Sequence, residues 1–238
     1  MEQSQQSRIG IIGALDEELA TIKAAAEIQG SEKVADMEFC VGTLGGKEIV
    51  IVKSGMGKVN AGICAQILIS RFSVTSIINT GVAGALDGRI NIGDIVISTD
   101  AVQHDFDVSP IGFAKGEIPY TGLYAFQADE TLRESARDAV KHAASGSAIY
   151  EGRVCSGDQF IASREKKQAI VDSFDGLCCE MEGAAVAQVC WLNHVPFVII
   201  RAISDKADHS EEINYASFAG ITARRSAAIV RAMIEHAV

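Results

Sequence analysis

The sequence lacks the usual signs of a nucleic-acid-binding, membrane or metal-binding protein. Its 21 lysines and arginines stand against 31 aspartates and glutamates, and the net charge of −10 repels nucleic acid and anionic membranes. No apolar run approaches the roughly 20 residues that a transmembrane helix needs. The 6 cysteines form no Cys-x-x-Cys pair, so we expect buried, reduced thiols. We therefore expect no metal site, no nucleic-acid partner and no membrane partner.

Proline is also scarce, with 3 among 238 residues, whereas 48% of the chain is hydrophobic. This composition excludes a disordered chain and provides a substantial core. Residues 1–7 are polar and rich in Gln and Ser, without an apolar stretch for export. We expect them to form a disordered extension, residues 8–238 to form a single domain, and the protein to be cytoplasmic.

Alternating strand and helix patterns predict an α/β fold, a three-layer α/β/α domain with a central mixed sheet. Strands are predicted at 9–12, 39–43, 48–53, 76–80, 95–98, 148–155, 177–180 and 197–203, and helices at 16–26, 59–71, 128–144, 163–172, 183–193 and 215–237. Gly45-Gly46 predicts a hairpin between the second and third strands, which makes the sheet mixed. Residues 101–126 have no clear period, and such a loop is usually functional or interfacial.

Acidic residues follow three of the predicted strands. Asp205 follows the apolar run 197–203, Glu180 and Glu182 follow 177–179, and Glu17-Glu18 follows 9–13. Ligands of open α/β folds bind at the carboxyl ends of strands, so these residues predict one acidic pocket. Helix capping alone would also explain Glu18 and Glu182. In the functional interpretation Glu18 is a general base, because apolar walls raise the pKa of a carboxylate.

The glycine-rich segments do not match the nucleotide-binding fingerprints. Ser54-Gly55-Met56-Gly57-Lys58-Val59 lacks the first glycine of a P-loop and has Val where Ser or Thr should follow the lysine. It predicts a tight strand-to-helix turn, where the backbone either approaches a ligand or only packs closely. The small residues 79–85 would let backbone amides meet a ligand. Phe160 could stack on a planar base beside the main chain of Ile161, or simply fill the core.

Six ordered motifs together resemble the 5′-methylthioadenosine/S-adenosylhomocysteine nucleosidases of the nucleoside phosphorylase superfamily, over residues 9–232. The motifs are Gly10-Ile11-Ile12-Gly13-Ala14-Leu15-Asp16-Glu17-Glu18, Lys53-Ser54-Gly55-Met56-Gly57-Lys58-Val59, Asn79-Thr80-Gly81-Val82-Ala83-Gly84, Ser156-Gly157-Asp158-Gln159-Phe160-Ile161, Glu180-Met181-Glu182-Gly183-Ala184 and Arg201-Ala202-Ile203-Ser204-Asp205. The resemblance implies hydrolysis of the N-glycosidic bond of methylthioadenosine and S-adenosylhomocysteine, and of 5′-deoxyadenosine. It implies release of adenine and a 5-substituted ribose in methionine salvage, with no cofactor.

The resemblance also implies a role for each matching residue. Glu18 would activate the attacking water, Asp205 would protonate purine N7, and Glu182 would hold the ribose hydroxyls. The other implied substrate contacts are Met181, Arg201, Phe160, Ile161, Met56, Val82 and Tyr215. Glu180 is a further candidate on other grounds, because residues two apart in an extended segment face the same side, so Glu180 and Glu182 could reach one cavity. Val82 departs from the serine of many family members and removes a hydroxyl. Val108, Ile111 and Pro119 match positions that close a neighbouring subunit's pocket, which implies a homodimer.

Three alternatives stay open. A purine nucleoside phosphorylase of this fold would place an arginine for phosphate in the first loop, where this chain has Leu15-Asp16-Glu17-Glu18. A futalosine hydrolase would share the fold and much of the chemistry. A non-catalytic adenosine-binding protein should have lost one of Glu18, Glu182 and Asp205, and all three are present.

Overall fold

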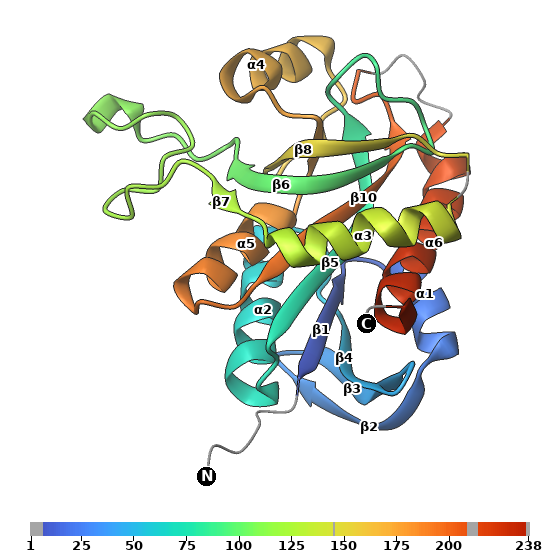
Figure 1. Cartoon of the computed structure of the whole chain (residues 1–238). Helices are drawn as coiled ribbons and strands as arrows, with labels where there is room; N and C mark the ends of the chain where they lie inside the picture. Colours follow the sequence, from blue (N-terminus) through green and yellow to red (C-terminus); the bar gives the residue numbers. More distant parts are fainter. Residues whose placement is uncertain (1–6, 145, 209–213, 237–238) are drawn as a thin grey trace.

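The computed structural model describes residues 7–144, 146–208 and 214–236 (Figure 1). For residues 214–217 it describes the backbone alone. The predicted N-terminal extension falls almost wholly on residues 1–6, outside this description. The elements are β1 (Arg8–Gly13), α1 (Asp16–Ala25), β2 (Glu27–Val34), β3 (Met37–Leu44), β4 (Lys47–Lys53), α2 (Lys58–Phe72), β5 (Ser76–Ala85), β6 (Ile95–Gln103), the 3-10 helix η1 (Ser109–Ile111), β7 (Phe126–Gln127), α3 (Glu130–Ala143), β8 (Ile149–Ser156), α4 (Arg164–Phe174), β9 (Cys178–Glu180), α5 (Gly183–Leu192), β10 (Phe197–Asp205) and α6 (Asn214–His236).

One mixed sheet runs through the molecule in the order β10-β6-β8-β9-β5-β1-β4-β3-β2. β5 pairs with β1 and β10 in parallel and with β9 antiparallel. Because β10 also pairs with β6, the strands β5, β10, β6, β8 and β9 form a closed circuit. The predicted α/β fold with a central mixed sheet is confirmed. The closure through β5 was not predicted, and it brings several strand ends to one place.

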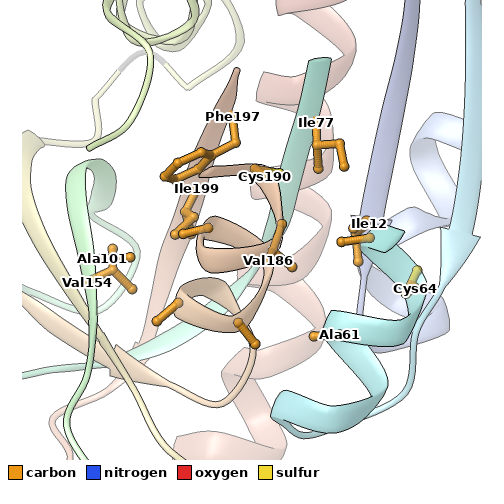
Figure 2. Close-up of a cluster of buried hydrophobic side chains, with 14 of the residues drawn as sticks. Ile12, Ala61, Cys64, Ile77, Ala101, Val154, Val186, Cys190, Phe197 and Ile199 are labelled. Atoms are coloured by element: carbon orange, nitrogen blue, oxygen red, sulfur yellow. The ribbon is translucent and has the colours of Figure 1, made fainter. Parts of the chain in front are cut away.

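The sheet is covered on both faces because its strands carry apolar side chains on both sides. In β10, Val198 and Ile200 belong to the core beneath α1, α3 and α6, whereas Phe197 and Ile199 belong to the core beneath α2 and α5. This alternation is the two-residue period of a strand. Figure 2 shows the second core, where Val186 of α5 lies among the strand side chains. The two cores fix the strands, and so the loops at their ends.

The predicted hairpin is confirmed, since Leu44 pairs with Lys47 across Gly45-Gly46 and both glycines have positive φ. The sequence did not predict β2, whose residues are mostly exposed and polar. It is a strand because its backbone pairs antiparallel with β3 along the sheet edge. Backbone pairing at a solvated edge leaves no hydrophobic pattern to detect.

Two predicted loops are partly strands. Residues 81–85 continue β5, and residues 101–103 continue β6. The segment between β6 and β7 contains η1 and extends away from the rest of the molecule (Figure 1). All six cysteines are buried and free, as predicted. Within the described residues, no helix combines the length and apolarity that a bilayer span requires.

Candidate active site

A cavity with an empty volume of about 590 Å³ lies where the ends of β1, β9 and β10 meet the second half of β5. Its lining residues are Ala14, Leu15, Glu18, Met56, Val82, Ala83, Gly84, Gln159, Phe160, Ile161, Cys179, Glu180, Met181, Glu182, Ser204 and Asp205. The three acidic strand ends therefore do converge on one pocket. A concave site lined mostly by apolar residues with a few converging acids suits a small-molecule ligand.

Glu18 lies in the first turn of α1 and is 3% exposed. One carboxylate oxygen accepts hydrogen bonds from the backbone amides of Ala14 at 2.6 Å and Leu15 at 3.0 Å, and the other accepts from Val82 N at 3.2 Å. Burial raises the pKa of Glu18, although Arg201 and these amides oppose the shift. Glu18 thus caps its own helix and also presents a carboxylate to the cavity. Capping and a role as a base are compatible.

Asp205 ends β10 and is half-buried at the cavity wall. Oδ1 accepts a hydrogen bond from Ala207 N at 2.8 Å, and Oδ2 accepts one from Ser204 Oγ at 2.8 Å. The same hydroxyl lies 3.3 Å from the carbonyl oxygen of Ala83, which is a second acceptor for it. The carboxyl group is therefore held in one orientation by its own chain.

Two glycines of β5 make room for the acids. A Cβ at Gly81 would lie 2.7 Å from Glu18 Oε1, and a Cβ at Gly84 would lie 2.8 Å from Asp205 Oδ1. Both distances are too short for real side chains, so any larger residue would displace the carboxylates. The small residues of this segment were expected to expose backbone to a ligand. Their close approach to Glu18 and Asp205 is an additional reason for their size.

Glu182 precedes α5 and is buried at the cavity wall. Its carboxylate makes no capping bond to α5 and instead accepts a hydrogen bond from Gly57 N at 2.7 Å. Burial and the neighbouring carboxylate of Glu180 raise the pKa of Glu182 to about 7. The capping interpretation does not account for this side chain. The turn at Gly57 therefore approaches the site, with its amide holding Glu182.

Glu180 and Arg201 form a buried pair beside the cavity. Arg201 is 1% exposed, and its guanidinium donates to Glu180, to the side-chain oxygen of Asn79 at 2.5 Å and to backbone carbonyls. Glu180 also accepts bonds from Ser156 Oγ and from the amides of Glu182 and Gly183. Glu180 lines the cavity, whereas Arg201 is not among the lining residues. Direct substrate contacts by either residue stay predictions.

The remaining predicted contacts surround the acids. Met181, Ile161 and Val82 line the cavity wall, and Val82 contributes its amide to Glu18. Met56 and Phe160 are 60% and 58% exposed, which places them at the mouth. Tyr215 lies in the first turn of α6, and its side chain is outside the described residues.

Other parts of the prediction fall outside the cavity. Val108, Ile111 and Pro119 lie in the projecting segment between β6 and β7, and Ile111 is 72% exposed. The described residues contain no cluster of three or more His, Cys, Asp or Glu arranged to hold a metal. The predicted site residues did not include Ala14, Leu15, Gln159, Cys179 and Ser204, which also line the cavity. Ala83 and Gly84 were expected only as part of the small-residue segment 79–85.

Comparison with known proteins shows the family of the chain. The model of the family described as the phosphorylase superfamily matches residues 8–235. A 5′-methylthioadenosine/S-adenosylhomocysteine nucleosidase of Shewanella loihica is 39% identical over 230 residues, 96% of this chain and 99% of the relative.

Two solved structures have closely similar folds. The Neisseria meningitidis 5′-methylthioadenosine/S-adenosylhomocysteine nucleosidase in complex with methylthio-immucillin-A has a TM-score of 0.92 at 35% identity, covering 96% of this chain and 99% of that one. Futalosine hydrolase of Helicobacter pylori has a TM-score of 0.90 at 32% identity, covering 96% and 97%. The chain therefore belongs to the phosphorylase superfamily and, within it, to the family of 5′-methylthioadenosine/S-adenosylhomocysteine nucleosidases.

Proposed function

We propose that the protein hydrolyses the N-glycosidic bond of 5′-methylthioadenosine and S-adenosylhomocysteine, and of 5′-deoxyadenosine, releasing adenine and the 5-substituted ribose. The observation that carries this proposal is the convergence of Glu18, Glu182 and Asp205 on one small cavity. Among the described residues that line it, none is a lysine or an arginine. An acidic wall suits a sugar that becomes cationic during bond cleavage.

Cleaving a glycosidic bond creates positive charge on the sugar and negative charge on the leaving base. Protonated Asp205 would donate its proton to purine N7, so that adenine leaves as a neutral molecule. The bonds from Ala207 N and Ser204 Oγ hold its carboxyl group in place. Glu182 would accept hydrogen bonds from the ribose hydroxyls and stabilise the cationic sugar through its charge.

Glu18 would accept the proton of the attacking water. Among the described residues, Oε1 accepts one hydrogen bond, from Val82 N, which leaves a second lone pair for a water molecule. Its raised pKa brings its basicity closer to that needed near neutral pH. The family role of Glu18 thus agrees with the geometry of its partners.

Water, rather than phosphate, is the proposed nucleophile. The first loop presents Ala14, Leu15 and Glu18 to the cavity, and a carboxylate would repel a phosphate dianion there. The test is mass spectrometry of the products after incubation with nucleoside and phosphate. Free 5-methylthioribose is expected, and 5-methylthioribose 1-phosphate would overturn the proposal in favour of a phosphorylase.

Futalosine hydrolysis is a second candidate, supported by the similarity to the Helicobacter pylori enzyme. The two candidates share the fold and differ in the group attached at the 5′ position. Adenine or hypoxanthine release should be compared for methylthioadenosine, S-adenosylhomocysteine, 5′-deoxyadenosine and futalosine at equal concentrations. Higher kcat/KM for futalosine than for the thioadenosines would reverse the assignment.

We also propose that the protein is a cytoplasmic homodimer that acts in methionine salvage. The projecting segment exposes Ile111 and contains Val108 and Pro119, which would close the pocket of the neighbouring subunit. Sedimentation at assay concentration should give a dimer. A fully active monomer would contradict the shared pocket.

A further inference from the structure

The first turn of α2 and the loops after β6 and β8 meet at Lys58, which is not among the residues that line the cavity. The Lys58 ammonium donates to Asp105 Oδ1 at 2.5 Å and to Gln103 Oε1 at 2.9 Å. The amide of Lys58 donates to Asp158 Oδ1 at 2.7 Å. The amide of Asp158 in turn donates to Asp105 Oδ2 at 2.8 Å. Lys58, Asp105 and Asp158 therefore close a ring of hydrogen bonds, called here the Lys58 ring.

The Lys58 ring is partly shielded from solvent. The side chains of Lys58 and Asp105 are 16% and 15% exposed. An ion pair at this depth is screened less than one on the surface and has a more fixed geometry. The three residues come from the start of α2, the loop after β6 and the loop after β8. The Lys58 ring therefore joins segments that are distant in the sequence.

The Lys58 ring is one residue from a direct contact with the site. Gly57 precedes Lys58, and its amide donates to Glu182 Oε1 at 2.7 Å. Gly57 has φ of +96°, and a Cβ there would lie 3.2 Å from Asp158 Oδ1. The turn is therefore held close to Asp158 in a conformation that favours glycine. Fixing Lys58 at both its amide and its ammonium fixes the position of the Gly57 amide.

We infer that Asp105 is a positioning residue for the reaction, which sets the Glu182 carboxylate through Lys58 and the Gly57 amide. Asp105 accepts from Lys58 on one oxygen and from Asp158 on the other, so its carboxylate spans the two loops. The inference rests on the proposed function, because it assigns Glu182 to ribose binding and charge stabilisation. Asp105 is not among the residues that line the cavity.

The test measures adenine release, first by single variants of the Lys58 ring and then by a double-mutant cycle that combines Asp105→Asn with Glu182→Gln. Asp105→Asn keeps the shape but removes the charge, and Lys58→Met removes the partner charge. We expect each to lower kcat/KM about tenfold, within the range of coupling between contacting residues. Asp138→Asn is the matched control, because Asp138 pairs with Lys141 at 2.6 Å on the exposed surface of α3. It should leave kcat/KM unchanged.

Coupling to Glu182 separates positioning from general destabilisation. If Asp105 acts through Glu182, adding Asp105→Asn to Glu182→Gln should change kcat/KM by less than about twofold. The pH profile gives a second readout. Burial and the carboxylates of Glu180 and Glu18 raise the pKa of Glu182, whereas the Gly57 amide and Arg201 lower it. Loss of that bond in Asp105→Asn should therefore move the acidic limb of kcat/KM to higher pH.

Three results would overturn the inference. They are near-wild-type kcat/KM in both Asp105→Asn and Lys58→Met, a loss that multiplies fully with that of Glu182→Gln, or failure of both single variants to fold. The last result would make the Lys58 ring a requirement for folding only. Absence of adenine release by the wild-type protein would instead remove the proposed function, so the two failures are distinguishable.

Discussion

Replacing Glu18 by glutamine tests the proposed base with little change of shape. The carboxylate accepts three backbone hydrogen bonds, from Ala14, Leu15 and Val82. A glutamine can turn its oxygen toward Ala14 and Leu15, which leaves its NH₂ group facing the Val82 amide. One hydrogen bond is then lost, which costs about 1 kcal/mol of folding free energy.

This cost is offset because the variant no longer buries a carboxylate. Desolvation raises the pKa of Glu18, so the charged form destabilises the folded state near neutral pH. We therefore expect the melting temperature of Glu18→Gln to lie within a few degrees of the wild type, as about 1 kcal/mol shifts Tm by roughly 2–4 °C at this size. Turnover should fall far more. Loss of a general base costs about 100- to 10,000-fold, or roughly 3–5 kcal/mol of transition-state stabilisation.

The assay is adenine release from saturating 5′-methylthioadenosine, followed chromatographically, with Tm measured on the same samples. Binding of the nucleoside should weaken only modestly, so the loss should appear in kcat rather than KM. A folded Glu18→Gln variant with near-wild-type kcat would show that Glu18 is a helix cap and not the base.

Three further predictions test the neighbouring groups. Asp205→Asn can keep the bond from Ala207 N on its amide oxygen, and its NH₂ group can donate to Ser204 Oγ when that hydroxyl turns to the Ala83 carbonyl, so the variant should fold normally. Its kcat should fall at least about 100-fold because N7 is no longer protonated, and retained turnover would contradict the role of Asp205 as the acid. Folding raises the pKa of Glu182 from 4.5 to about 7, so ionisation of this carboxyl lowers the free energy of unfolding of the wild type as pH rises through that window. In denaturant titrations between pH 4.5 and 8, the free energy of unfolding of Glu182→Gln should therefore rise by up to about 3 kcal/mol relative to that of the wild type. A difference that stays constant with pH would refute the buried charge. Gly84→Ala should lower kcat about 100-fold by displacing the Asp205 carboxylate, whereas Gly88→Ala, with no atom within 4 Å, should not; equal activity of the two would contradict the close approach.

The location of the site could be predicted because it follows from strand ends. Asp205 and Glu18 follow strands that are both parallel to β5, and parallel strands deliver their carboxyl ends to one edge. Glu182 follows β9, which runs antiparallel to β5, so its place in the site depends on that pairing instead. The hairpin at Gly45-Gly46 could be predicted for a similar reason, since two adjacent glycines permit the positive φ that the turn needs. Each of these features is local, with its cause contained in a few consecutive residues.

The closed circuit of strands could not be predicted in this way. It depends on β5 pairing with β10 on one side and with β9 near its end, although about 90 to 120 residues separate these segments. The continuation of β5 through residues 81–85 could not be predicted either. Small residues there were expected to form a loop, because a strand lined by glycine has no hydrophobic pattern of its own.

The same pairing explains why Glu18 and Asp205, from opposite ends of the chain, belong to one site. β5 lies between β1 and β10, and Gly81 and Gly84 on it face the two carboxylates in turn. The distance between the two acids is therefore set by the three-residue interval between Gly81 and Gly84 on one strand, rather than by the loops that carry the acids. Substitutions in those loops should change substrate preference, whereas substitutions at Gly81 or Gly84 should change the chemistry itself.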